Sequence, residues 1–134
     1  MTAHSFESAK TLLISKLKSH GLRLRHQDPV NHAAFGNTYA DFETNGLLVR
    51  LVLDRGQLLL SVAAINDLEA SPWYPADSVL EFLGRLPQVE RDEPIAIDEA
   101  INVLDSAFPE VSDLFRRFPA SKVELDQYLR RQSQ

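Results

Sequence analysis

Residues Gly46–Ile65 read GLLVRLVLDRGQLLLSVAAI. Two apolar runs flank a short polar turn, Asp54–Gln57. In both runs the side chains alternate with a period of two, which places successive residues on opposite faces of a strand. Gly56 can adopt the positive φ that a short turn requires. The stretch therefore predicts a β-hairpin at the centre of an antiparallel sheet, covered on at least one face.

Two further segments have strand character on the N-terminal side of this hairpin. Residues 22–26 read LRLRH and alternate strictly, and residues 35–44 read FGNTYADFET. Between the second segment and the central hairpin stands Asn45-Gly46, a dipeptide typical of tight hairpin turns. These patterns predict four antiparallel strands joined as a meander, with residues 22–26 as a candidate edge strand.

An N-terminal helix is predicted over Ser5–His20. Ser5 is a suitable N-cap, and Gly21 stands where a helix C-cap is expected. One stripe of apolar residues recurs at helical spacing, Phe6, Ala9, Leu13 and Leu17. We expect this stripe to pack on the sheet.

The C-terminal half favours helices. We expect one over Asp77–Leu86, one from Asp98, a short one after Pro109, and a final one that begins with a capping box at Ser121–Glu124. Val123, Tyr128 and Leu129 are expected to bury its apolar side. The fold class that follows is α+β in a single domain over residues 1–134, with any minor seam near residues 87–94.

Composition limits the chemistry. The chain has 134 residues and no cysteine, which excludes disulfides, thiol catalysis and zinc sites built on sulfur. The first ten residues lack the features of a signal peptide, and no apolar run approaches the roughly 20 residues that span a bilayer. We expect a cytoplasmic protein that does not insert into a membrane.

Charge is distributed unevenly along the chain. Residues 66–113 carry twelve acidic side chains, opposed only by Arg85 and Arg91. Such a segment attracts basic partners and repels nucleic acid, so nucleic-acid binding is not expected. The alternative is an ordinary solvated surface of helices.

No catalytic or metal-binding motif stands out. His26, Asp28 and His32 form an H-x-D-x-x-x-H pattern, but Pro29 interrupts the segment, so we expect no metal site there. Asp41 and Glu43 would share one strand face, which we expect to be the solvent face of an edge strand. The sequence gives no reason to expect a catalytic residue or a cofactor.

The adjacent aromatics Trp73 and Tyr74 have two interpretations. They close the rim of the core beneath a loop, or they anchor a protein partner, since Trp and Tyr dominate binding hot spots. Asp67, Glu69 and Asp77 bracket them. The predicted partner-binding set combines the aromatic pair with acidic residues, Trp73, Tyr74, Asp67, Glu69, Glu90, Asp92 and Glu93.

Part of the chain resembles a known group of proteins. The run YADFETNGLLVRLVLDRGQLLLSV (Tyr39–Val62), followed by WYPADSVLEFL (Trp73–Leu83), is similar to small bacterial proteins, some of which resemble immunity proteins of polymorphic toxin systems. The resemblance covers about residues 35–85. It implies a stoichiometric inhibitor without chemistry of its own, and no family active site to transfer to this chain.

Three functional hypotheses follow. The first is a non-catalytic, immunity-like module that binds a basic protein. The second is a small-molecule-binding protein or enzyme with a pocket between sheet and helices that uses Asp41, His26 or Arg50. The third is a homodimeric structural or chaperone-like adaptor that associates through an exposed sheet face or through the C-terminal helices.

Overall fold

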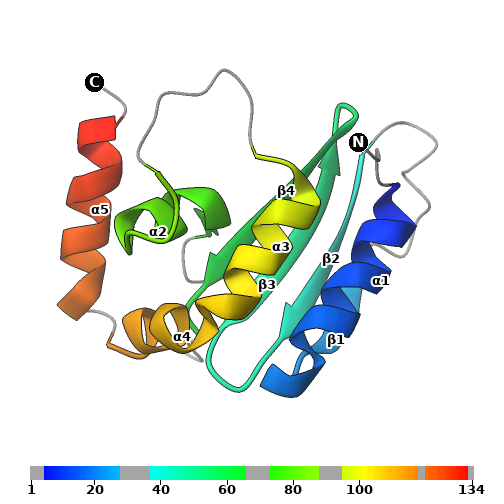
Figure 1. The fold of residues 1–134 in the computed structure, drawn as a ribbon, viewed down its shortest axis with the longest axis horizontal. Coiled ribbons are helices and arrows are strands. Elements are labelled where there is room, and N and C mark those ends of the chain that lie inside the picture. The colour runs from blue at the N-terminus through cyan, green and yellow to red at the C-terminus, as the bar shows by residue number, and fades with distance from the viewer. Residues whose placement is uncertain (1–4, 28–36, 66–72, 88–94, 118–119, 133–134) are drawn as a thin grey trace.

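A computed structural model describes residues 5–27, 37–65, 73–87, 95–117 and 120–132. The fold is α+β, with an antiparallel sheet in the order β1-β2-β3-β4-β5 (Figure 1). The strands are β1 (Arg23–Gln27), β2 (Thr38–Glu43), β3 (Leu48–Asp54), β4 (Gln57–Ala63) and β5 (Tyr74–Pro75). The helices are α1 (Phe6–Leu17), the 3-10 turn η1 (Lys18–His20), α2 (Ala76–Phe82), α3 (Ile97–Ser106), α4 (Phe108–Arg116) and α5 (Ala120–Gln132).

The predicted central hairpin is confirmed. Strands β3 and β4 pair in register from Leu48 opposite Ala63 to Asp54 opposite Gln57. The two residues between them, Arg55 and Gly56, have φ values of 54° and 81°. Positive φ at both central positions is the geometry that matches the twist of two strands joined by a two-residue loop.

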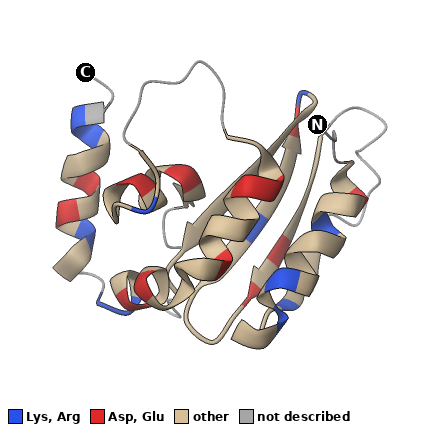
Figure 2. Ribbon diagram, viewed as in Figure 1, with Lys and Arg blue, Asp and Glu red and all other residues tan. Residues whose placement is uncertain are grey.

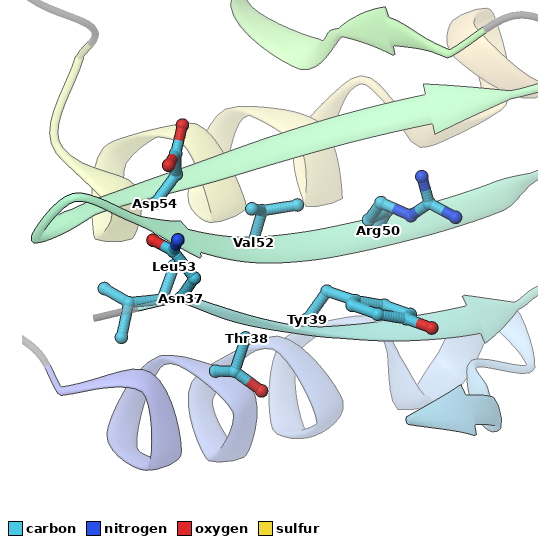
Figure 3. A pocket seen from close by; sticks show the side chains of 7 residues that line it. All are labelled: Asn37, Thr38, Tyr39, Arg50, Val52, Leu53 and Asp54. Atoms are coloured by element: carbon cyan, nitrogen blue, oxygen red, sulfur yellow. The ribbon is translucent and has the colours of Figure 1, made fainter. Parts of the chain in front are cut away.

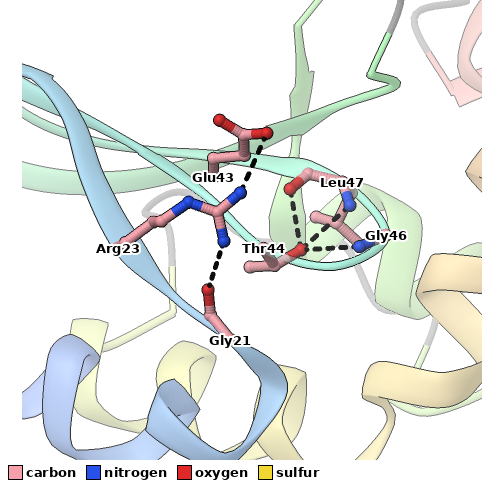
Figure 4. Close-up of polar contacts among 6 residues, drawn as sticks. All are labelled: Gly21, Arg23, Glu43, Thr44, Gly46 and Leu47. Carbon is pink, nitrogen blue, oxygen red and sulfur yellow. Dashed lines mark hydrogen bonds and ion pairs between the residues drawn. The ribbon is translucent and has the colours of Figure 1, made fainter.

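The predicted turn between β2 and β3 is also present, and Thr44 organises it (Figure 4). The Thr44 hydroxyl donates to the Leu47 carbonyl at 2.8 Å and accepts from the Leu47 N–H at 2.9 Å. Gly46 does not have a positive φ here. It is required for space instead, because a Cβ at this position would collide with the side chain of Ser112 in α4.

Two expectations about strands need correction. Strand β2 lies between β1 and β3, so Asp41 and Glu43 do not belong to an edge strand. The sheet also has a fifth strand where a loop was expected, because Tyr74 and Pro75 pair antiparallel with Val62 and Ser61. A two-residue strand carries no periodic pattern that a sequence could reveal.

Helix α1 has the predicted N-cap and buried stripe but ends at Leu17, and the 3-10 turn η1 continues it to His20. The Ser8 N–H donates to Ser5 Oγ at 3.1 Å, and Gly21 ends η1 with a φ of 81°. The stripe residues are all buried, Phe6, Ala9, Leu13 and Leu17. In Figure 1, α1 and α3 lie on the same side of the sheet, where they cover a shared core.

The C-terminal helices are present with altered ends. Helix α2 ends at Phe82 rather than Leu86, and Gly84 follows with a φ of 76°. The expected capping box of α5 is wrong, because Ser121 is buried within the helix and donates its hydroxyl to the Leu114 carbonyl. Val123 is 59% exposed rather than packed, whereas Tyr128 is buried and Leu129 packs against the core as expected, and Leu125 is also buried. Within the described residues, no helix has the length and apolar character to cross a membrane.

Candidate interaction surface

The two faces of the sheet differ. Strand residues that belong to the core alternate with residues that do not, and the core set includes Ala40, Phe42, Val49, Leu51, Leu60 and Val62. The opposite face points away from α1 and α3 (Figure 1). We call it the open face and define it by Tyr39 and Asp41 of β2, Leu48, Arg50 and Val52 of β3, Leu59 and Ser61 of β4, and Trp73 before β5. These side chains are neither buried nor fully exposed.

An ion pair crosses the centre of this face. Asp41 and Arg50 stand directly opposite one another in the β2–β3 register. Arg50 Nε donates to Asp41 Oδ1 at 2.6 Å, and a terminal guanidinium nitrogen donates to Asp41 Oδ2 at 2.9 Å. The hydrogen bond to Asp41 raises the pKa of Arg50 above its ordinary value. This bidentate geometry holds the guanidinium in one orientation.

Two aromatic rings flank the same guanidinium. Its central carbon lies 4.2 Å from the centroid of the Trp73 ring and 5.4 Å from that of Tyr39. The Tyr39 hydroxyl in turn lies 2.9 Å from His26 Nε2. A cation placed over an aromatic face is attracted by the ring quadrupole. Strands β1, β2 and β3 and residue Trp73 thus contribute to one connected cluster.

A hollow of about 390 Å³ adjoins this cluster (Figure 3). Tyr39 and Arg50 lie toward one end of it, and Asn37 and Asp54 lie toward the other. Val52 forms part of its floor between them. The hollow is open to solvent and combines apolar surface with polar groups.

The structure separates the two predicted aromatic anchors. Trp73 lies beside Arg50 and is half-buried. Tyr74 belongs to the core, where it is only 4% exposed, and its hydroxyl donates to Asp126 Oδ1 at 2.8 Å. Burial, together with this hydrogen bond, raises the pKa of Tyr74 far above its ordinary value. Tyr74 therefore closes the core, which was one of the two interpretations of the aromatic pair.

The five acidic members of the predicted partner-binding set lie outside the described residues, Asp67, Glu69, Glu90, Asp92 and Glu93. Acidic side chains of the described part lie on α2, α3 and α4 (Figure 2). Several of them are paired within the chain, as in the hydrogen-bonded pair Asp105–His20 and the ion pairs Glu110–Arg85 and Asp113–Arg117.

In the part of the chain that the structure describes, no group of three or more His, Cys, Asp or Glu side chains gathers to hold a metal ion. His26 faces the Tyr39 hydroxyl, and the other two members of the H-x-D-x-x-x-H pattern, Asp28 and His32, lie outside the described residues.

Sequence reasoning named Asp41, Arg50 and His26 as alternative pocket residues but missed how they combine. The pairing of Asp41 with Arg50 could have been predicted from the sequence. Counting outward from the Asn45-Gly46 turn pairs Thr44 with Leu47 and places Asp41 opposite Arg50. The approach of Trp73 to Arg50 carried no such signal, because it depends on the pairing of β5.

Comparison of the chain with protein-family models, with curated proteins and with solved structures found no match in any of the three. The similarity to immunity proteins therefore remains an expectation from the sequence.

Proposed function

We propose that this chain is a non-catalytic protein-binding module, of the immunity-like kind, and that its partner docks on the open face. The observation that carries the proposal is the arrangement of Trp73, Arg50 and Tyr39 on that face. Tryptophan, tyrosine and arginine are the residue types most enriched among binding hot spots.

The arrangement favours binding because it is already ordered. Asp41 holds Arg50 through two hydrogen bonds, and the guanidinium contacts both rings. A partner therefore does not have to immobilise these side chains, a step that costs about 0.5–1.5 kcal/mol for each flexible side chain. Val52 and Leu59 provide apolar area beside the cluster.

We further propose that the partner is basic. The support is the concentration of acidic residues between positions 66 and 113, including the five predicted contact residues outside the described part. Charge complementarity acts mainly on the association rate. Reversal of Glu90, Asp92 and Glu93 to Lys should then slow association at low salt. An unchanged association rate would remove these residues from the interface.

The docking proposal is tested by affinity capture with the intact chain and with Trp73→Ala as bait. Val123→Ala is the matched control, because Val123 is exposed on α5, away from the open face. Circular dichroism first establishes that both variants stay folded. We expect a stoichiometric partner that the wild type and the control retain and Trp73→Ala loses. The captured pair is then measured by calorimetry, where Trp73→Ala should weaken binding about tenfold or more.

The proposal fails if a folded Trp73→Ala and a folded Tyr39→Ala both bind the purified partner with wild-type affinity. Capture of a second copy of the chain in place of another protein would instead support the homodimeric adaptor. Analytical ultracentrifugation of the free chain distinguishes these two results.

The hollow beside Arg50 supports a second candidate, a small-molecule-binding protein. Its volume of about 390 Å³ lies within the range of ligand sites, and Tyr39, Asn37 and Arg50 offer polar groups beside the apolar Val52. A metabolite panel screened by thermal shift tests this, because a ligand that binds only the folded state raises the melting temperature. Val52→Trp, which fills the hollow, should abolish any such shift.

A further inference from the structure

Strand β1 lies at one edge of the sheet. It pairs with β2, and no other described strand lies along its outer side. All five of its residues are exposed. In an edge strand, alternate N–H and C=O groups point away from the neighbouring strand and remain available to a further chain.

The opposite edge is less suited to accept a strand. Strand β5 has two residues, of which one is Pro75. Proline has no N–H to donate to a ladder, and two residues give too short a template. Of the two edges that the structure describes, β1 is the one that offers a length typical of natural strands.

The surroundings of β1 are basic. Residues 5–27 carry five lysines and arginines against Glu7 alone. Lys16, Lys18 and Arg25 are exposed, and Lys10 Nζ donates to Gln27 Oε1 at 3.0 Å, which ties α1 to the end of β1. Figure 2 shows blue segments on α1, while the neighbouring helix α3 carries red ones. Arg23 is paired with Glu43 of the neighbouring strand.

The positive charge around β1 favours some binding partners of this edge over others. A second copy of the chain would bring its own Arg23 and Arg25 against this edge, and like charges placed opposite one another destabilise a strand pair. An acidic strand meets the opposite situation, since its carboxylates approach the exposed Arg25.

We propose that β1 accepts an extended acidic segment of a partner protein as an additional strand of the sheet. Leu24 adds a requirement, because it is 53% exposed and stands opposite Phe42, on the side of the core. The segment should therefore alternate apolar residues, which cover Leu24, with acidic ones. This inference concerns the edge of the sheet and stands independently of binding to the open face.

The test uses the whole chain and a short synthetic peptide of alternating Glu and Val. Titration is followed by NMR amide shifts and by hydrogen exchange of the β1 amides. We expect saturable binding that slows exchange in β1. Two further peptides carry N-methyl groups on either the odd or the even residues. Strand addition predicts that one of these two peptides fails to bind, because only one edge of the peptide faces β1.

Matched variants complete the test. Arg25→Glu should weaken peptide binding about tenfold or more. Arg131→Glu, an exposed charge reversal on α5, should leave it unchanged. Trp73→Ala should also leave it unchanged, which separates this inference from the proposed function.

Three results would overturn the inference. The first is absence of binding to the folded chain at millimolar peptide. The second is equal binding of both N-methylated peptides, which would indicate attraction by charge without strand pairing. The third is dimerisation of the free chain with protection of β1 from exchange, which would make a second copy the occupant.

Discussion

Asp41 and Arg50 face one another across β2 and β3, joined by hydrogen bonds of 2.6 and 2.9 Å, and the same guanidinium lies 4.2 Å from the ring centroid of Trp73. Trp73, which immediately precedes β5, thus contacts the ion pair that joins β2 and β3. Trp73 is the single tryptophan of the chain, so its fluorescence reports on this contact.

Substitution Arg50→Met should alter Trp73 emission and lower the free energy of unfolding by about 1 kcal/mol, because the partly exposed side chain loses its charged hydrogen bonds. Urea titration followed by fluorescence measures both effects. Arg85→Met, which removes a pair with Glu110 elsewhere, is the control and should leave the emission of the folded state unchanged. Identical spectra for both variants would contradict the contact.

Gly46→Ala should destabilise the fold by about 1–3 kcal/mol, because the added methyl group enters the space of Ser112 and forces a shift between the β2–β3 turn and α4. Thermal unfolding measures the loss. Ser112→Ala in the same chain should recover part of it. Gly46 lacks a positive φ, so a cost that Ser112→Ala leaves untouched would assign the role of Gly46 to the backbone instead.

Arg55→Asn should stabilise the chain by a few tenths of a kcal/mol. Arg55 occupies the left-handed region with a φ of 54°, which asparagine tolerates better than arginine. The Arg55 N–H bond to Asn37 Oδ1 is a backbone contact and is retained. Chemical denaturation measures the change, and a decrease in stability would show that the Arg55 side chain contributes more than its conformation costs.

Asp126 makes stability depend on acid pH. Burial would raise the pKa of this carboxyl, but hydrogen bonds from Lys122 and Tyr74 outweigh it and lower the pKa below the ordinary 3.8. The carboxylate therefore stabilises the fold above that ordinary value, and this contribution disappears as the pH falls through the lower, folded-state pKa. Between neutral pH and pH 2, the free energy of unfolding should depend less on pH in Asp126→Asn than in the wild type. The exposed control Glu99→Gln should keep the wild-type dependence.

The sequence was sufficient for features that depend on neighbours in the chain. The cap at Ser5, the left-handed Gly21 and the β3–β4 hairpin each rest on local backbone chemistry. The burial of the α1 stripe follows from helical spacing alone. These local signals agree with the tertiary structure, so they were readable from one sequence.

Features that join distant segments were not readable. Strand β5 forms because Tyr74 pairs with Val62 of β4 and its hydroxyl donates a hydrogen bond to Asp126 of α5. Ser121 was predicted to be a helix cap, but its hydroxyl donates a hydrogen bond to the Leu114 carbonyl of α4 instead. The candidate interaction surface has the same origin, because Trp73 reaches Arg50 only once β5 is in place. In each case a contact with another helix or strand overrides the local pattern.

The order of the strands has a consequence for how the chain folds. Each strand pairs with the one that precedes it in the sequence, and none crosses over another. During synthesis every new strand therefore meets a partner that has already been made. Contacts between sequence neighbours close short loops and favour rapid folding. The sheet can thus assemble progressively from its N-terminal side as the chain leaves the ribosome, and α3 to α5 arrive last to cover a largely formed β-meander.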